Sequence, residues 1–266
     1  MIDWTDAFDN SAYVPGSADL IGLWEAQAAA FREALGARAR CNLVYGPGAR
    51  EKYDLFQPEG EAQGLAIFIH GGYWHRLDRS YFSHFAAGPL ARGWAVAMPS
   101  YPLAPDARIS EITQAVRRAV TRVAEAQKGP VRLIGHSAGG HLVSRMACAG
   151  VLPSKVAERL DRVVSVSGIH ILEPLTLSKM NETLKLTKDE ARAESPALQD
   201  PIACKITAWV GANERPELIR QTRLLVEAWG LKGADIGQEF ERGRDHFDVI
   251  ASLRAPDGAL VEELLR

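Results

Sequence analysis

The chain has 266 residues, of which 47% are hydrophobic and 24% charged, and its formal net charge is −2. This length suits one large domain with its own core, and the nearly balanced charge gives no reason to expect nucleic acid or an anionic membrane as a partner. No stretch approaches the roughly 18 apolar residues of a membrane span, the first residues lack the pattern of a signal peptide, and three separated cysteines argue against a disulfide framework, so we expect a reduced, cytoplasmic protein.

Helix-like and strand-like segments alternate from the start of the chain. Apolar residues recur at helical spacing over 20–35, which predicts an N-terminal helix. A short strand is expected over 52–56, at the antiparallel start of a sheet, and a buried strand over 65–69. The alternation continues to the end of the chain. It predicts an α/β fold, a three-layer α/β/α sandwich around a mainly parallel sheet of about eight strands.

The strand expected over 65–69 runs directly into a loop of sequence H-G-G-Y-W at positions 70–74. Two glycines allow the backbone to approach a ligand closely. In acyl transfer, fixed backbone donors stabilise the oxyanion of the transition state, and each is worth about 3 kcal/mol. We expect the N–H groups of Gly72 and Tyr73 to form an oxyanion hole together with that of Ala138.

A second motif follows a strand expected over 94–98 and a helix expected over 112–124. The apolar run at 131–134 leads into Gly135-His136-Ser137-Ala138-Gly139, a G-x-S-x-G pattern. A serine at a sharp turn from strand to helix is strained and accessible, and the helix expected over 138–149 would point its positive N-terminus at it. The pattern alone arises by chance in many chains. Combined with the glycine-rich loop, it predicts that Ser137 is a nucleophile.

About forty residues separate a strand expected over 163–166 from the next one, over 206–210. This stretch does not have the pattern of a single crossover helix, and we expect a small cap insertion at roughly 170–200. Thr187 followed by Glu190 resembles a capping box that starts a short helix. An ordinary surface insertion is the alternative. No linker or repeat divides the chain, so residues 1–266 are expected to form one domain.

The last third of the chain offers an acid and a base in the order expected for this architecture, nucleophile, acid and then histidine. Glu214 follows a strand-like run, and His246 comes after a last expected strand and is the only histidine beyond position 170. His246 would take the proton of Ser137 while Glu214 orients the ring. Asp245 and Asp248 are alternative partners, although such close neighbours rarely face the ring correctly.

Most other histidines favour structural roles, and His70 and His136 are expected to brace the two motif loops. No metal site or cofactor is expected, because the chain has no H-E-x-x-H pattern, no C-x-x-C pair and no clustered ligand spacing.

Together, H-G-G-Y-W at 70–74 and G-H-S-A-G at 135–139 resemble the α/β-hydrolase fold and, within it, the kynurenine formamidase (arylformamidase) group marked by H-G-G-x-W. The segments 101–105 and 167–175 are also similar to that group, so the likeness covers nearly the whole chain. The resemblance implies a serine hydrolase that cleaves N-formyl-L-kynurenine to kynurenine and formate. The family more often has aspartate where this chain has Glu214, whose longer side chain shifts the carboxylate.

The same resemblance implies an aromatic leaving group, and Trp74, His170 and Tyr81 are candidates to bind it by stacking. Core packing is the alternative for these rings. The expected partner is a small-molecule substrate, and a homodimer stays open. A broad carboxylesterase for short-chain acyl esters would use the same triad and is the alternative function. A binding module without catalysis would be expected to lack a triad residue, and all three positions are filled here.

Overall fold

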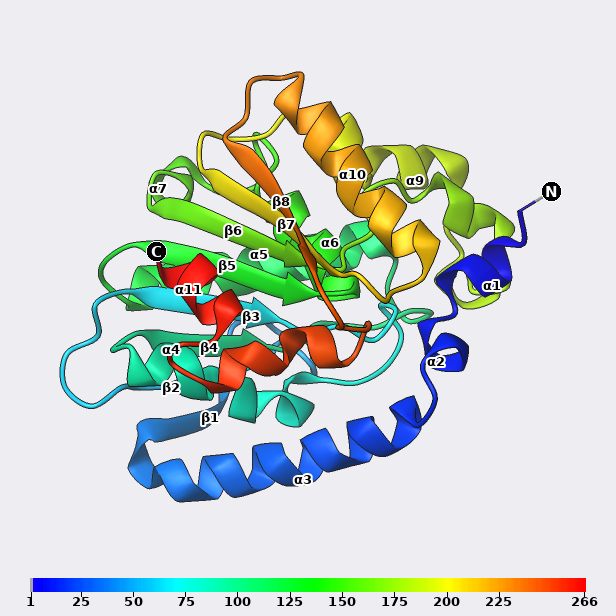
Figure 1. Cartoon of the computed structure of the whole chain (residues 1–266). Coiled ribbons are helices and arrows are strands. Elements are labelled where there is room, and N and C mark those ends of the chain that lie inside the picture. Colours follow the sequence, from blue (N-terminus) through cyan, green and yellow to red (C-terminus); the bar gives the residue numbers. More distant parts are fainter. Residues whose placement is uncertain (1) are drawn as a thin grey trace.

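The computed structural model describes residues 2–266, and a sheet of eight strands in the order β1-β2-β4-β3-β5-β6-β7-β8 forms their centre (Figure 1). β2 pairs antiparallel with β1 and β4, and the other neighbouring strands are parallel. The predicted mainly parallel sheet with an antiparallel start is therefore confirmed. The strands are β1 (Ala39–Val44), β2 (Lys52–Phe56), β3 (Leu65–Ile69), β4 (Ala95–Pro99), β5 (Val131–His136), β6 (Leu160–Val166), β7 (Lys205–Gly211) and β8 (Ile236–Glu241).

Helices cover both faces of the sheet, because successive side chains of a strand point to opposite sides. Leu65, Ile67 and Ile69 of β3 belong to one hydrophobic cluster, whereas Ala66 and Phe68 belong to a second one. The first cluster includes α5 (Ile109–Ala126), α6 (Ala138–Met146), α7 (Ser154–Ala157) and α10 (Pro216–Gly230). The second includes α3 (Ser17–Leu35), η3 (Ser83–Ala86), α4 (Ala87–Ala91), η6 (Asp248–Arg254) and α11 (Ala259–Leu265). The predicted three-layer sandwich is confirmed.

Most expected elements are present with shifted ends. β2 and β3 have the predicted bounds, and α5 begins three residues before the predicted start. The helix expected over 138–149 ends at Met146, because the chain then turns and Cys148 forms an isolated bridge with Pro201. The elements that were not predicted include β1, α1 (Trp4–Phe8) and α2 (Asn10–Tyr13) at the start of the chain, and α4, α7 and α10 later in it. The turns η1 (Gly36–Arg38) and η2 (Arg79–Tyr81) complete this half of the chain.

The segment between β6 and β7 forms short helices, and in Figure 1 it lies at the side toward which the arrowheads of β5 and β6 point. Thr187 accepts a hydrogen bond from the Glu190 N–H at 3.2 Å and caps the short helix, as its sequence predicts. α1 lies beside this segment, and the Lys179 N–H donates to Thr5 Oγ1 at 2.9 Å. The segment between β6 and β7 contains η4 (Glu173–Leu177), α8 (Asn181–Leu184), α9 (Lys188–Ala193) and η5 (Pro196–Leu198).

Across residues 2–266, no helix is long and apolar enough to cross a membrane. The expected cellular location and the homodimer stay predictions.

Candidate active site

Ser137 lies at the sharp turn between β5 and α6 and has φ 58° and ψ −118°, in the left-handed half of backbone space. Such a conformation costs a non-glycine residue on the order of 1–3 kcal/mol and is retained where the surroundings enforce it. The Ser137 N–H donates to the Val166 carbonyl at 2.8 Å. A Cβ on Gly139 would lie 2.0 Å from the Ile69 carbonyl oxygen, so only glycine fits there. The predicted strand, turn and helix around the serine are confirmed.

The structure brings the three predicted residues of the triad together. His246 Nε2 lies 3.1 Å from Ser137 Oγ, and His246 Nδ1 lies 2.6 Å from Glu214 Oε2. The three residues are 3–5% exposed. Ser137 follows β5, Glu214 follows β7 and His246 follows β8, so the site lies at the carboxyl ends of the strands, where open α/β sheets bind ligands.

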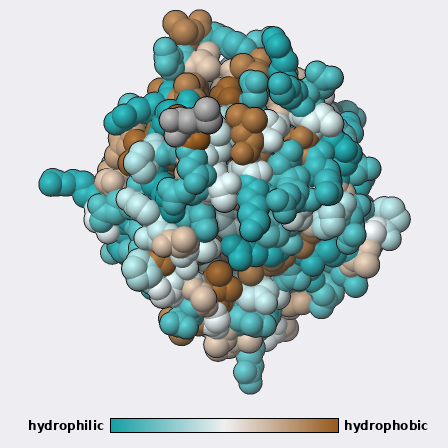
Figure 2. All heavy atoms as spheres, turned by 90° about the vertical axis from the view of Figure 1, so that its right-hand side faces the viewer, coloured by the Kyte–Doolittle hydropathy of each residue, from teal (hydrophilic) through white to brown (hydrophobic). Residues whose placement is uncertain are grey.

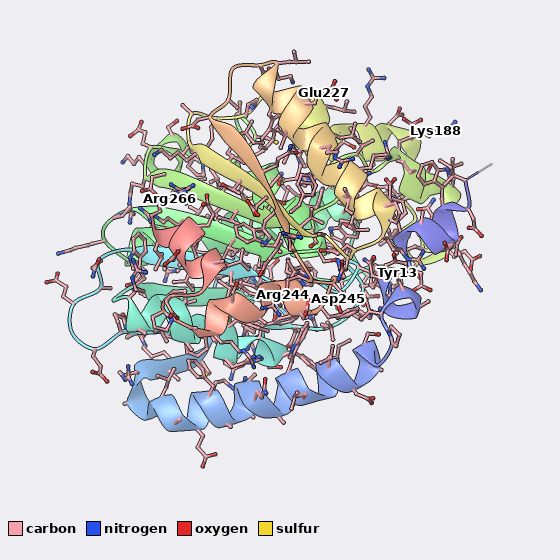
Figure 3. All side chains as sticks on the ribbon, in the orientation of Figure 1. Tyr13, Lys188, Glu227, Arg244, Asp245 and Arg266 are labelled. Carbon is pink, nitrogen blue, oxygen red and sulfur yellow. The ribbon has the colours of Figure 1, made fainter. Side chains whose placement is uncertain are left out.

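The two alternative acids have other roles. Asp245 Oδ1 accepts hydrogen bonds from the N–H groups of Phe247 at 2.8 Å and Asp248 at 3.1 Å. Asp248 Oδ1 accepts from the Asp245 N–H at 2.7 Å. Figure 3 labels Asp245 next to Arg244, in the loop before η6. Both carboxylates therefore hold the backbone of this loop, and Glu214 is the acid at the ring of His246.

Glu214 is fixed at its second oxygen by a residue to which the sequence analysis gave no role. Glu214 Oε1 accepts hydrogen bonds from Ser167 Oγ at 2.5 Å and from the Gly211 N–H at 2.8 Å. Ser167 directly follows β6, the neighbour of β7. The sequence signal that could have identified Ser167 is its position directly after β6, because the neighbouring strand β7 leads to Glu214.

His136 braces the loop of the candidate base, in line with its predicted structural role. Its Nε2 lies 2.7 Å from the His246 carbonyl oxygen, to which it donates. Burial first, and the nearby His246 second, lower the pKa of His136 to about 3, so its ring is neutral at pH 7. A neutral ring with its proton on Nε2 keeps His246 in place without adding a charge beside it.

The loop after β3 lies beside the serine and carries backbone N–H groups that have no protein acceptor among the described residues. Gly72 and Tyr73 have φ 116° and 53°, and a Cβ on Gly72 would lie 2.1 Å from the Arg76 carbonyl oxygen. Within residues 2–266, the N–H groups of Gly72, Tyr73 and Ala138 donate to no protein acceptor. A Cβ on Gly71 would lie 3.1 Å from Ser137 Cβ, so the loop runs directly beside the serine.

A small pocket of about 20 Å³ contains both Ser137 and His246. This volume is only slightly larger than the space that one water molecule needs. Its apolar wall includes Trp24 of α3 and Phe247, to which the sequence analysis gave no role because they are distant from both motifs. The described residues that line it are Ile21, Trp24, Gly71, Gly72, Tyr73, Arg76, Leu77, Phe82, His136, Ser137, His246 and Phe247.

The expectation that Trp74, His170 and Tyr81 contact a substrate is not supported by this geometry. Trp74 and His170 have no exposed surface. Trp74 donates from Nε1 to His141 Nδ1 at 3.2 Å, and His170 Nε2 lies 3.1 Å from Ser165 Oγ. Tyr81 is half-buried and packs against the second hydrophobic cluster. Trp74 braces its loop from below, which was the alternative interpretation.

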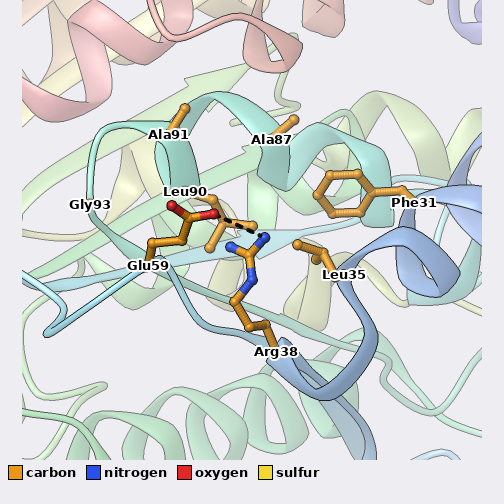
Figure 4. A pocket seen from close by; sticks show the side chains of 8 residues that line it. All are labelled: Phe31, Leu35, Arg38, Glu59, Ala87, Leu90, Ala91 and Gly93. Carbon is orange, nitrogen blue, oxygen red and sulfur yellow. Dashed lines mark ion pairs between the residues drawn. The ribbon is translucent and has the colours of Figure 1, made fainter.

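Another hollow shares none of its described lining residues with the pocket beside Ser137. A hollow of about 420 Å³ between α3 and α4 has Arg38 and Glu59 at its edge, and these pair with each other at 3.6 Å (Figure 4). Among residues 2–266, no group of three or more His, Cys, Asp or Glu side chains could hold a metal ion.

The model of the alpha/beta hydrolase family matches residues 66–261. The chain belongs to the alpha/beta hydrolase family. This hydrolase is 31% identical over 242 residues to a kynurenine formamidase of Salmo salar, which covers 86% of this chain and 82% of that relative. It is 29% identical over 235 residues to a kynurenine formamidase of Danio rerio, which covers 85% and 80%. The resemblance to the kynurenine formamidase group is therefore confirmed.

Two solved structures place the hydrolase among known folds. A protein of Silicibacter sp. tm1040, described as a candidate thioesterase, is 48% identical and superposes with a TM-score of 0.94 over all of both chains. Esterase B of Lactobacillus rhamnosis is 18% identical and superposes with a TM-score of 0.71 over 96% of this chain and 93% of that one. At that lower identity the likeness concerns the fold alone.

Proposed function

We propose that this hydrolase removes a small acyl group by serine catalysis, and that its substrate is the formyl amide of N-formyl-L-kynurenine, which yields kynurenine and formate. The observation that carries the proposal is the line from Glu214 through His246 to Ser137, at 2.6 and 3.1 Å, next to unused backbone donors. The similarity to two kynurenine formamidases over four fifths of their length supports this substrate.

In the first half of the proposed reaction, Ser137 Oγ attacks the formyl carbon and its proton moves to His246 Nε2. The carbonyl oxygen becomes an oxyanion, which accepts hydrogen bonds from the N–H groups of Gly72, Tyr73 and Ala138. When the C–N bond breaks, His246 gives its proton to the departing aniline nitrogen. Kynurenine leaves, and the formyl group remains as an ester of Ser137.

In the second half, His246 removes a proton from a water molecule, which attacks the formyl ester. The intermediate collapses, His246 returns the proton to Ser137 Oγ, and formate leaves. Throughout, Glu214 keeps the ring in the tautomer with its proton on Nδ1 and stabilises the imidazolium that forms in each half.

The size of the pocket supports a small acyl group. About 20 Å³ beside the serine is close to the space of one water molecule, which favours a formyl group over a long acyl chain. A short acyl thioester is the second candidate, because the relative of 48% identity from Silicibacter sp. tm1040 is described as a candidate thioesterase.

The test measures kcat/KM on N-formyl-L-kynurenine, p-nitrophenyl acetate and an acetyl thioester with the same protein. We expect N-formyl-L-kynurenine to be the best of the three substrates. Ser137→Ala is expected to lower kcat by at least about 10⁴-fold while the protein keeps its fold, because the oxyanion donors alone retain only a small part of the catalysis.

Rapid hydrolysis of the ester or thioester with no release of formate from N-formyl-L-kynurenine would reject the formamidase and leave the serine hydrolase. If Ser137→Ala kept most of the activity, the serine mechanism itself would be wrong. Chelators are expected to leave the rate unchanged.

A further inference from the structure

A second and larger hollow lies next to the pocket that holds Ser137. It has a volume of about 430 Å³, and three segments line it, at 5–11, 73–76 and 178–183. Tyr73 and Arg76 line both hollows, so these two side chains mark the boundary between them. We call the larger hollow the outer groove. The side of the molecule that carries α1 and α9 is mostly hydrophilic at its surface (Figure 2).

The N-terminal wall of the outer groove is fastened at several points. The Tyr73 hydroxyl accepts a hydrogen bond from the Asn10 N–H at 3.0 Å. Arg215, the residue after Glu214, pairs with Asp6 at 2.8 Å, and its Nε donates to the Asp9 carbonyl at 2.7 Å. Its guanidinium also stacks on the ring of Tyr13, which Figure 3 labels on α2. The groove is therefore preformed, with one wall held by the loops that carry the candidate acid and the candidate oxyanion donors.

Arg76 has an oriented guanidinium without a carboxylate partner. Its Cζ lies 4.8 Å from the centre of the Tyr73 ring, and its Nη2 donates to Ser11 Oγ at 3.1 Å. Among residues 2–266, no Asp or Glu oxygen lies within ion-pair distance of Arg76, whereas Arg215 pairs with Asp6. A guanidinium held by stacking, with several N–H groups unused, is suited to bind a carboxylate.

The remaining charges of the outer groove are of both signs. Lys179 adds a second cation, while Asp9 and Glu182 add two acids that form no ion pair within the described residues. Burial first, and Arg76 second, lower the pKa of His75, so its ring is neutral at pH 7. A polyanion such as the phosphates of coenzyme A would meet both acids, whereas an ammonium and a carboxylate on one small molecule would each find an opposite charge.

We propose that the outer groove binds the leaving group of the substrate, that this group is amino-acid-like, and that Arg76 binds its carboxylate. This inference rests on the proposed function. The formyl group enters the small pocket beside Ser137, while the aromatic amine passes Tyr73 and its amino-acid end lies in the groove. Arg76 thereby determines which amides are cleaved and takes no part in the bond-breaking steps.

The test compares N-formyl-L-kynurenine with 2-formamidoacetophenone, which has the same formyl anilide and ring ketone but no amino-acid end. Wild-type protein is expected to prefer N-formyl-L-kynurenine. Arg76→Gln is expected to lower that preference, the ratio of the two kcat/KM values, by about tenfold, mainly through KM, because a charge-assisted hydrogen bond is lost. Arg76→Lys keeps the charge and is expected to fall between the two.

The matched control is Arg122→Gln, since Arg122 is exposed on α5 and forms no ion pair within the described residues. It should leave the preference unchanged. A second measurement does not depend on turnover: in the Ser137→Ala background, Arg76→Gln should raise the Kd of L-kynurenine about tenfold, as measured by calorimetry.

The two proposals fail in different ways. If both formyl substrates are cleaved and Arg76→Gln leaves the preference or the Kd of L-kynurenine unchanged, the inference about the groove is overturned and the formamidase stands. If neither substrate is cleaved while Arg76→Gln still weakens the binding of L-kynurenine, the formamidase is rejected and the amino-acid site stands.

Discussion

At the scale of single residues, the carboxylate of Glu214 is held at both of its oxygens. One oxygen faces His246, and the other accepts hydrogen bonds from Ser167 and from the Gly211 N–H. A glutamate has one more rotatable bond than an aspartate and needs more contacts to keep a fixed position. The hydroxyl of Ser167 compensates for the extra length of the side chain.

We therefore expect Ser167→Ala to lower kcat about tenfold with little change in KM, because the acid loses one charge-assisted hydrogen bond and orients His246 less well. Steady-state kinetics on the best substrate checks this. Ser165→Ala removes the hydroxyl two residues earlier, in β6, which bonds the Gly140 carbonyl and His170, and serves as the control. An equal loss of kcat in both variants would contradict the role given to Ser167.

The sequence predicted Ser137, His246 and Glu214 because a motif and the order of residues along the chain identify them without reference to packing. Trp74 and His170 follow strands in the same way, yet their side chains point into the protein interior. The order of residues says which loop carries a side chain, but the side to which that side chain points depends on the packing beneath the loop.

At the scale of elements, a buried polar cluster joins β1, β2 and η2. Arg79 pairs with Asp54 at 2.8 Å and donates to Ser100 Oγ at 2.9 Å and to Asn42 Oδ1 at 2.5 Å. Asp54 also accepts from the Asn42 N–H at 2.8 Å. Arg79 and Asp54 are both buried, so each charge depends on the other for its solvation.

Asp54→Ala is expected to lower the free energy of unfolding by about 3 kcal/mol, since it leaves the Arg79 guanidinium buried without its counter-charge. Urea denaturation at pH 7 measures this. Asp200→Ala breaks the exposed pair with Lys232, at 2.8 Å, and should cost less than about 1 kcal/mol. Similar losses in the two variants would show that burial does not set the strength of the Asp54 pair.

Sequence patterns missed β1, α1 and α2 for identifiable reasons. β1 is an edge strand, four of its six residues are exposed and the other two are half-buried, and Asn42 has φ 61° where the pairing with β2 shifts. It therefore lacks the alternation of a half-buried strand. α1 and α2 have five and four residues, too few to show a helical period. α5, with nine buried residues at helical spacing, was predicted for the opposite reason.

At the scale of the whole molecule, five histidines are buried in neutral form. Burial is the first cause that lowers the pKa of His136 and His170 to about 3 and that of His70, His84 and His141 to about 4. In the unfolded chain each has a pKa near 6.5. Between pH 6.5 and about 4 the unfolded chain therefore binds more protons than the folded protein, and acid favours unfolding.

We expect the free energy of unfolding to be highest above pH 6.5 and to fall steeply as the pH drops toward 4, with up to about 1.4 kcal/mol per pH unit for each histidine. Urea denaturation at pH 7.5, 6.5, 5.5 and 4.5 measures the slope. His84→Leu removes one of the five groups and should make the fall shallower. A free energy of unfolding that stays constant from pH 7.5 to 4.5 would contradict this account.

Because Arg215 holds α1 and α2 in place, the two ends of the chain differ as points for attaching the protein to other molecules. The first helices of the chain line the outer groove, the proposed entrance to the site, whereas Arg266 lies on the opposite side of the molecule (Figure 1). A purification tag, fluorophore or solid support joined ahead of Asp3 would crowd the entrance for incoming molecules. The same attachment made after Arg266 would leave that entrance open, so immobilised preparations should be linked through the C-terminus.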